Sequence, residues 1–239
     1  MLGVDVYEPM VSKVAGPGLG QAPASPLRRV QARPASLQPL LKRALDILGA
    51  GALLLLTAPA FLLLALLIRA DGGPVFYAHE RVGRAGHRFG CLKFRSMVTD
   101  SQARLAALLE ADPAARAEWE ATRKLKDDPR VTGTGRFLRA TSLDELPQLI
   151  NVLRGEMSLV GPRPVVAAEL AAHYGAAAEH YLAVRPGITG LWQISGRSET
   201  SYDIRVALDT RYVANLSVWT VLGILLRTPL VVLSRRGAY

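Results

Sequence analysis

The chain has 239 residues, half of them hydrophobic and only 6% aromatic, which is long enough for one well-packed domain with an appendage. Its 29 lysines and arginines outnumber its 20 aspartates and glutamates, and the formal charge of +9 predicts an anionic partner: nucleic acid, anionic lipid or a phosphorylated small molecule. Cys91 is the only cysteine, so the composition excludes an intramolecular disulfide and any metal site built from several cysteines.

The first 40 residues are rich in proline and glycine, most densely between Gly16 and Pro26. These residue types interrupt helices and loosen the backbone, so residues 1–40 are predicted to form a disordered leader. The apolar stretch that follows starts too late for a secretory signal, and we expect none.

Residues 41–70 contain a long apolar run. Between residues 44 and 68 the only charge is Asp46, and as one helix this run would be ~37 Å long at ~1.5 Å per residue, enough to cross a bilayer. Pro59 removes a backbone donor inside the run, and basic residues flank both ends, which is typical of two cytoplasmic ends. We therefore predict a re-entrant helix–break–helix that bends at Ala58 and Pro59. A single span with a proline kink is the alternative.

Strands and helices are expected next. Residues 74–83 and 87–97 are predicted to be two short strands separated by turn glycines, which form a small β-hairpin element. Residues 101–126 are predicted to be helical and to be divided at Asp112-Pro113, with the aspartate as cap and the proline in the first turn. Residues 127–135 are expected to form a loop.

A further helix is predicted from the spacing of the apolar residues between Leu143 and Leu153. Ser142 is expected to cap this helix, with Glu145 completing a capping box, although Pro147 disturbs its first turn. The sequence GPRP (161–164) is expected to end regular structure.

The last part of the chain is predicted to contain a helix near residues 165–180, the turn-rich RPGITG (185–190) and an apolar C-terminal segment. The longest uncharged run of that segment, residues 218–226, is too short to cross a bilayer. We therefore predict an amphipathic helix at the membrane interface, with Trp219 at headgroup level.

Asp144 and Glu145 are the strongest candidates for chemistry. Acids in the first turn of a helix offset its dipole, and capping alone would explain them. Their surroundings favour more than capping, because Arg139 and Arg163 lie on either side in sequence and a basic strand segment lies upstream. Carboxylates with several cations suggest a site for phosphate and a divalent metal.

Other candidate residues lie in short basic motifs. Lys93 and Arg95 alternate in the second predicted strand and together could hold a diphosphate. GPRP fixes the position of Arg163, and RPGITG places Arg185 beside a rigid turn. The chain has neither a Walker nor a Rossmann phosphate loop, and its histidines lack the spacing of a metal pair.

Nucleic acid is the weakest of the anionic partners. No motif interleaves aromatic residues with the basic ones for base stacking. A membrane segment explains the positive charge better, through anionic lipid headgroups. A membrane-anchored scaffold that binds without chemistry is the alternative from another functional class.

Three motifs carry a resemblance to a known family. LKFRSM (92–97), LRATSLDELPQLINVLRGEMSLVGPRP (138–164) and YLAVRPGITGLWQISGR (181–197) closely resemble the bacterial sugar transferases, or small monotopic phosphoglycosyl transferases. The resemblance runs from about Lys42 to the C-terminus. It implies an α+β, mostly helical, monotopic membrane protein with a re-entrant segment at 41–70, a catalytic domain at 71–239 and interfacial C-terminal helices.

The resemblance also implies the reaction. Asp144 would be the nucleophile that attacks the β-phosphate of a UDP-sugar and expels UMP, and undecaprenyl phosphate would then accept the phosphosugar. Glu145 would be the partner in the dyad, and both acids would hold Mg²⁺. The expected location is the cytoplasmic face of the bacterial inner membrane. The dipole of the predicted helix should keep Asp144 ionised.

The residues that the resemblance assigns to substrate and phosphate binding lie in the three motifs. They are Lys93, Arg95, Arg139, Pro162, Arg163, Pro164, Arg185, Gln193 and Arg197. One departure concerns the membrane bend, where the family commonly has Ser-Pro and this chain has Ala58-Pro59. We expect the hydroxyl of Thr57 to replace the missing serine by bonding a carbonyl that the proline leaves free.

The insert between residues 100 and 130 and the short C-terminal ending look most like rhizobial-type exopolysaccharide initiators. Those enzymes are similar to galactose-1-phosphate transferases, and the donor expected by analogy is UDP-galactose, with UDP-glucose as the rival. The expected partners are this donor, undecaprenyl phosphate and anionic membrane lipids, without nucleic acid. A homodimer is left open.

Overall fold

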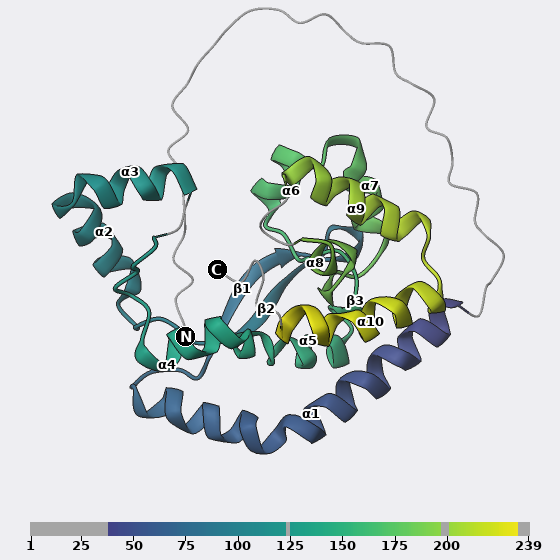
Figure 1. Cartoon of the computed structure of the whole chain (residues 1–239), viewed down its shortest axis with the longest axis horizontal. Helices are drawn as coiled ribbons and strands as arrows, with labels where there is room; N and C mark the ends of the chain where they lie inside the picture. Colours follow the sequence, from purple (N-terminus) through teal and green to yellow (C-terminus); the bar gives the residue numbers. More distant parts are fainter. Residues whose placement is uncertain (1–37, 123–124, 197–200, 234–239) are drawn as a thin grey trace, which may run out of the picture. The chain divides into compact units, whose positions relative to one another are not determined.

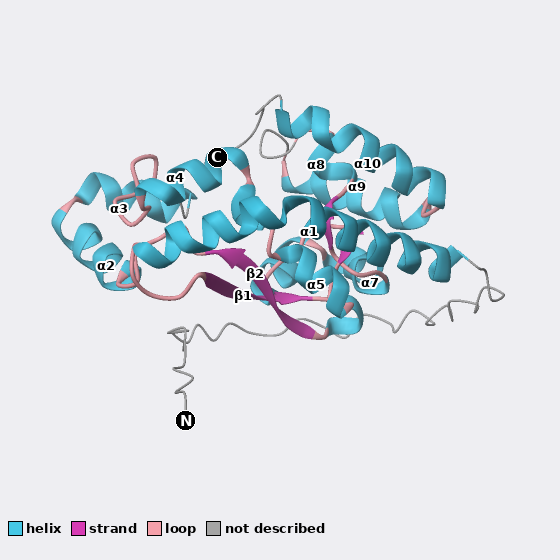
Figure 2. Ribbon diagram, turned by 90° about the horizontal axis from the view of Figure 1, so that it is seen from below, coloured by secondary structure: helices cyan, strands magenta, loops and turns pink. Residues whose placement is uncertain are grey.

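The structure, a computed structural model, describes residues 38–122, 125–196 and 201–233, all in the one structural unit formed by residues 37–239. The predicted leader, 1–40, lies outside these residues except for its last three, which belong to the first helix. As the sequence predicts, helices predominate over a few short strands (Figures 1 and 2).

The elements in chain order are α1 (Gln38–Ala70), β1 (Phe76–Val82), η1 (Arg84–Gly86), β2 (Arg88–Phe94), α2 (Ser101–Ala111), α3 (Pro113–Thr122), α4 (Gly133–Thr141), η2 (Leu143–Glu145), α5 (Gln148–Arg154), β3 (Ser158–Val160), α6 (Ala167–His173), η3 (Gly175–Ala177), α7 (Ala178–Ala183), β4 (Gly187–Thr189), α8 (Leu191–Ile194), α9 (Tyr202–Ala214) and α10 (Val218–Leu233).

The apolar run forms one continuous helix, α1, which is long and apolar enough to cross a membrane. The expected break at Ala58-Pro59 is therefore wrong. The helix continues through Pro59 and is curved along its length (Figure 1). Pro59 has no N–H to offer the carbonyl of Leu55. Thr57 bonds a different carbonyl from the one expected, since its hydroxyl donates to Leu53 (2.7 Å), a bond that itself favours bending. Whether the segment is re-entrant stays a prediction.

Both ends of α1 are tied to the rest of the unit. Near the N-terminal end, Asp46 is buried and accepts hydrogen bonds from Lys42 Nζ (2.6 Å), from Ser158 Oγ (3.0 Å) and from the Leu159 N–H (3.0 Å). At the other end, the carbonyl of Ile68 accepts a bond from Arg95 Nη2 (2.8 Å). The one charge inside the apolar run therefore fixes α1 to β3, since a buried carboxylate needs such partners.

The predicted β-hairpin is confirmed and supports the site. β1 and β2 lie side by side (Figure 2) and pair antiparallel. Tyr77 lies opposite Lys93, and Phe76 lies opposite Phe94. Phe94 packs against the second half of α1 together with Leu138 of α4. β2 is also held from the side by Asn151 of α5, which is fully buried. Its side chain accepts from the Leu92 N–H (2.9 Å) and donates to the Gly90 carbonyl (2.8 Å).

The division of the helical segment at Asp112-Pro113 is also confirmed. α2 ends at Ala111 and α3 starts at Pro113. Asp112 Oδ1 accepts hydrogen bonds from the N–H groups of Ala114 (2.8 Å) and Ala115 (3.1 Å), which is the expected capping role.

The two glycine- and proline-rich motifs pack against each other, backbone to backbone. GPRP directly follows β3, and RPGITG contains β4, so the motifs meet where the two strands pair in parallel. A Cβ on Gly187 would lie 2.1 Å from the nitrogen of Gly161, and one on Gly190 would lie 2.2 Å from the Gly161 carbonyl oxygen. Glycine is needed here because no side chain fits between the two backbones. This parallel pair is absent from the sequence prediction, which expected turns.

The C-terminal part contributes two helices. α9 packs against α6, α7 and α8, and Tyr174 and Tyr181 are buried beneath it with Val165. α10 buries Val221 and Ile224 in the core that includes Leu159 and Val160 of β3, and exposes large apolar side chains elsewhere on its surface. Those exposed residues are Trp219, Leu226, Leu230 and Val232.

Candidate active site

Asp144 and Glu145 lie in a tight turn between two helices. α4 ends at Thr141, and Ser142 adopts a left-handed conformation (φ 57°) with its N–H bonded to the carbonyls of Leu138 and Arg139. A serine in this region costs roughly 1–2 kcal/mol, and such strain is common at functional sites. The expected capping box is wrong, because Ser142 is the C-cap of α4, makes no side-chain cap bond, and α5 starts only at Gln148.

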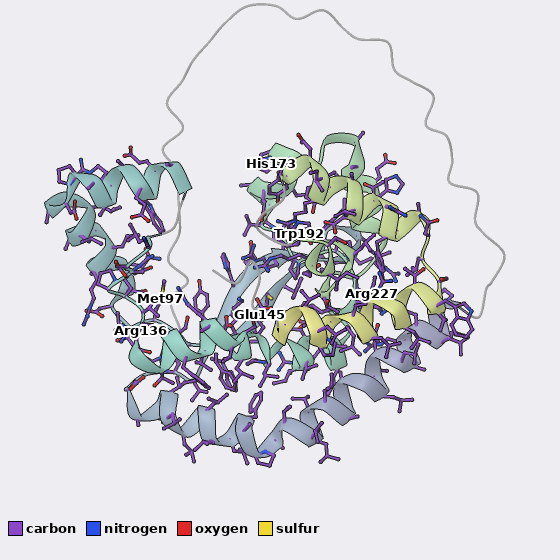
Figure 3. All side chains as sticks on the ribbon, viewed as in Figure 1. Met97, Arg136, Glu145, His173, Trp192 and Arg227 are labelled. Carbon is purple, nitrogen blue, oxygen red and sulfur yellow. The ribbon has the colours of Figure 1, made fainter. Side chains whose placement is uncertain are left out.

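Lys93 links the two carboxylates. Its Nζ lies 3.2 Å from Asp144 Oδ2 and 2.8 Å from Glu145 Oε1. Lys93 is the last residue but one of β2, so β2 places the cation, and the η2 turn places both acids; Glu145 of this turn is labelled in Figure 3. The arrangement is a pair of adjacent carboxylates with a shared ammonium group.

Burial and charge act against each other on these groups. Asp144 is only 8% exposed. Burial raises the pKa of its carboxyl above the ordinary value, while the charge of Lys93 opposes this rise. Burial would lower the pKa of Lys93, but the charges of Glu145 and Asp144 raise it overall. The helix whose dipole was expected to act on Asp144, α5, begins only at Gln148, and the charge of Lys93 is what opposes protonation of Asp144.

Arg163 and Arg139 are the other predicted cations whose charges reach the site. Arg163 lines a pocket with Lys93 and Glu145, and its charge lowers the pKa of Lys93, after the larger effects of burial and of the two acids. Arg139, in the last turn of α4, bonds Ser96 Oγ (3.0 Å) and contributes to holding down the pKa of Asp144. These two arginines stay candidates for phosphate binding.

Two predicted cations bond elsewhere. Arg95 is buried and donates to the Ile68 carbonyl, at the C-terminal end of α1. Arg185 donates to the Gly155 carbonyl (2.6 Å) and interacts electrostatically with Arg43 and Asp46. Both arginines thus bond backbone carbonyls at helix ends, Arg95 near the end of α1 and Arg185 at the residue that follows α5, and not the dyad. Alternation in a strand predicted that Arg95 would share the face of Lys93, but β2 ends at Phe94.

The remaining predicted site residues support the pocket or lie outside the described part. Pro164 lines the pocket. Pro162 is buried and its carbonyl accepts from the Gly187 N–H (2.8 Å), and Gln193 is buried in α8 beside Gly190. Arg197 lies outside the described residues.

The pocket also contains residues that the sequence analysis did not assign to the site. His79, Arg81 and Cys91 of the hairpin line it, together with Gln148 of α5. Strand alternation was the available signal, since residues 79 and 81 share a face with Tyr77, the partner of Lys93. Burial raises the pKa of Cys91 to about 11, so the thiol is protonated and is no competing nucleophile.

The two acids form a partial donor set for Mg²⁺. Mg²⁺ prefers oxygen ligands and is commonly held by one or two carboxylates together with substrate phosphates and water. Asp144 and Glu145 fit this pattern, although Lys93 lies between Oδ2 and Oε1. Among the described residues no group of three or more acidic, histidine or cysteine side chains could hold a metal.

The sequence of the chain was compared with those of known proteins and matches a protein family. Residues 37–235 match the family model described as bacterial sugar transferase. The chain is 54% identical over 199 residues to the UDP-galactose-lipid carrier transferase of Erwinia amylovora, covering 83% of this chain and 42% of that protein. It is 53% identical over 199 residues to the exopolysaccharide production protein ExoY of Rhizobium meliloti, with 83% and 88% covered.

A third relative has glucose in its name. The UDP-glucose:undecaprenyl-phosphate glucose-1-phosphate transferase of Caulobacter vibrioides is 39% identical over 226 residues, which cover 91% of this chain and 76% of that protein. The chain therefore spans less than half of some curated relatives and most of others. Both the matched length and these identities lead to one conclusion: the chain belongs to the bacterial sugar transferase family.

Proposed function

We propose that the protein transfers a hexose 1-phosphate from a UDP-sugar to undecaprenyl phosphate, releases UMP, and so initiates exopolysaccharide or another surface glycan. The observation that supports it most is the ion pair of Lys93 with both Asp144 and Glu145 beside a pocket that Arg163 also lines. The names of the relatives favour UDP-galactose or UDP-glucose as donor and undecaprenyl phosphate as acceptor.

The chemistry divides into two displacements at one phosphorus. In the first, a carboxylate oxygen of Asp144 bonds to the β-phosphorus of the donor, and the bond from that phosphorus to the bridging oxygen breaks. UMP leaves with the bridging oxygen and its electron pair. In the second, a phosphate oxygen of undecaprenyl phosphate bonds to the same phosphorus, and the bond to Asp144 breaks. The carboxylate is restored without an external oxidant, reductant or proton donor.

The cations of the site have separate tasks in this scheme. Lys93 keeps Asp144 ionised and can neutralise charge on the transferring phosphoryl group, where such electrostatic stabilisation is often the largest contribution. Arg163 is placed to hold the diphosphate of the donor by its planar fork. Asp144 and Glu145 would hold Mg²⁺, which when bound would neutralise phosphate charge.

The contacts of α1 support a location at one membrane face. Arg43 Nη1 donates to the Val152 carbonyl (2.7 Å) near one end of α1, and Arg95 bonds the Ile68 carbonyl near the other. A helix that spanned the bilayer would carry one end away from the catalytic domain, whereas these contacts hold both ends of α1 to that domain. Between them the helix exposes leucines such as Leu55 (80% exposed), a surface suited to lipid. We infer a re-entrant segment entered from the cytoplasmic face of the inner membrane.

A turnover assay tests the proposed function. The full chain in detergent with undecaprenyl phosphate and Mg²⁺ is expected to release UMP from UDP-galactose or UDP-glucose, and a chelator should stop the release. Without undecaprenyl phosphate, the covalent mechanism limits UMP to one equivalent per protein, measured by rapid quench. An acceptor-free protein that continues to release UMP would instead act by direct hydrolysis, and absence of release from every UDP-sugar tested would refute the transfer itself.

Membrane topology gives a second prediction. Single cysteines at Leu40 and Asp71, in a Cys91→Ser background, are expected to react with a membrane-impermeant maleimide only when it is added from the cytoplasmic side. The measurement compares right-side-out with inside-out vesicles. Labelling of the two positions from opposite sides would replace the re-entrant segment by a span.

A further inference from the structure

Arg81 is a cation of the pocket that the proposed chemistry has not yet used. It lies on β1 and lines the same pocket as Lys93, Glu145 and Arg163, and its side chain is 20% exposed. The guanidinium is held on two sides: Nη2 lies 3.2 Å from His79 Nδ1, and Nη1 lies 3.7 Å from Glu169 Oε2. An arginine oriented in this way presents its remaining donors in a fixed direction.

Glu169, near the start of α6, is shared between two arginines. Its Oε2 faces Arg81, while its Oε1 accepts from Arg205 Nη1 (3.0 Å) and from the hydroxyl of Tyr202. Burial acts to raise the pKa of Glu169, but the Tyr202 bond and the charges of Arg205 and Arg81 lower it overall. Glu169 is therefore an ionised, partly buried carboxylate (side chain 25% exposed) between two cations.

Arg205 continues this connection to Arg163. Its Nη2 donates to the Arg163 carbonyl (3.4 Å), and its guanidinium carbon lies 4.7 Å from the centre of the Trp192 ring. The guanidinium carbon of Arg163 lies 5.9 Å from the centre of the same ring. Trp192, labelled in Figure 3, thus contacts both arginines, and stacking on an aromatic ring restricts a guanidinium group.

We propose that Arg81 binds phosphate of the nucleotide donor and that Glu169 is the positioning residue that orients it, and, through Arg205 and Trp192, also orients Arg163. The proposal rests on the function proposed above and adds to it two residues and a route of coupling. Without the negative charge of Glu169, Arg81 would lose its ion-pair partner, and Arg205 would lose one of the two carboxylates, Glu169 and Asp209, whose charges act on it. With it, two arginines are held ready for a diphosphate before the substrate arrives.

Binding of UDP and of uridine to the full chain in detergent tests the proposal, because uridine has no phosphate. Arg81→Met is expected to weaken UDP binding ~10-fold or more, as loss of a charge-assisted bond does, and to leave uridine binding unchanged. Arg81→Lys, which keeps the charge but loses the fork, should give a smaller loss. The matched control is the exposed pair Arg88 and Glu80 on the same hairpin, 2.8 Å apart. Arg88→Met and Glu80→Gln should bind UDP as the wild type does.

A double-mutant cycle tests the positioning role. Glu169→Gln is expected to weaken UDP binding several-fold on its own and to weaken it by a smaller factor in the Arg81→Met background, where only the effect of Glu169 through Arg163 remains. Should Glu169→Gln fail to fold, Glu169→Asp takes its place, since its shorter carboxylate cannot reach both arginines. Additive losses, or a fall of uridine and UDP binding in parallel, would contradict the positioning role.

The outcome is separable from that of the proposed function. UDP binding by Arg81→Met as tight as that of the wild type would overturn the role of Arg81, even if the wild type transfers phosphosugar. A wild-type protein that neither binds UDP nor releases UMP would overturn both.

Discussion

Asp144→Asn is expected to lower the rate of UMP release by ~10⁴-fold or more, because the amide cannot form the bond to phosphorus on which both displacements depend. The same variant should show no covalent label after incubation with a UDP-sugar carrying ³²P in its β-phosphate, whereas the wild-type protein should retain label when undecaprenyl phosphate is omitted. The measurements are a UMP-coupled rate and autoradiography of the denatured protein.

Asp144→Asn should fold at least as well as the wild type. Since burial raises the pKa of Asp144, the native state binds the proton more tightly than the unfolded chain does, and ionisation of this group lowers stability as the pH rises through the raised pKa. A neutral amide of similar shape avoids that cost, so the melting temperature at neutral pH should not fall. Asp100→Asn, an exposed aspartate paired with Arg104, is the control. An Asp144→Asn protein with wild-type turnover would assign the nucleophile elsewhere.

Lys93→Met is expected to lower kcat/KM by ~10²-fold at neutral pH, the size of effect seen when one electrostatic donor of an active site is lost. It should also change the pH profile. Because the charge of Lys93 holds the pKa of Asp144 down against burial, its removal raises that pKa further. The acid limb of the kcat/KM profile, where Asp144 must lose its proton, should therefore move to higher pH.

The conservative variant separates charge from structure. Lys93→Arg keeps a cation next to the two acids and should leave the acid limb close to that of the wild type, even if the rate falls. Lys126→Met removes an exposed lysine and should change neither the rate nor the profile. If Lys93→Met lowered activity by the same factor at every pH, the lysine would act on the substrate and not on the ionisation of Asp144.

Local features of the fold could be predicted from the sequence. The hairpin follows from two β-prone segments around turn glycines, and both strands lie within the predicted ranges. The division at Asp112-Pro113 follows from a proline that cannot continue a helix and an aspartate that caps the next one. These features depend on a few neighbouring residues, so no knowledge of distant contacts was required.

The start of the helix after the dyad could not be predicted in this way. Ser142 has the residue type of an N-cap, but the structure uses it as the left-handed end of the preceding helix. Ser142 could either end one helix or begin the next. Leu138 packs against Phe94 and α1, and α4 continues from there to Thr141, so that Ser142 is its end. Arg95 and Arg185 were misplaced for a similar reason, because backbone carbonyls from distant segments are their partners.

The apolar run, the hairpin, the family resemblance and the identity of the adjacent acids can be read from the sequence, because each is encoded in residue types at short spacing. That the apolar run forms one helix without a break at Pro59 could not be read in this way. Only the tertiary structure decided which cations face those acids. Lys93 meets them because Asn151 and the β1 pairing hold β2 against α5. Arg81, which lines the same pocket, is oriented there by Glu169, a residue distant in sequence whose Oε2 lies 3.7 Å from Arg81 Nη1 in the fold. Contacts between residues so distant in sequence depend on the packing of the whole unit. A local sequence pattern holds no information about that packing.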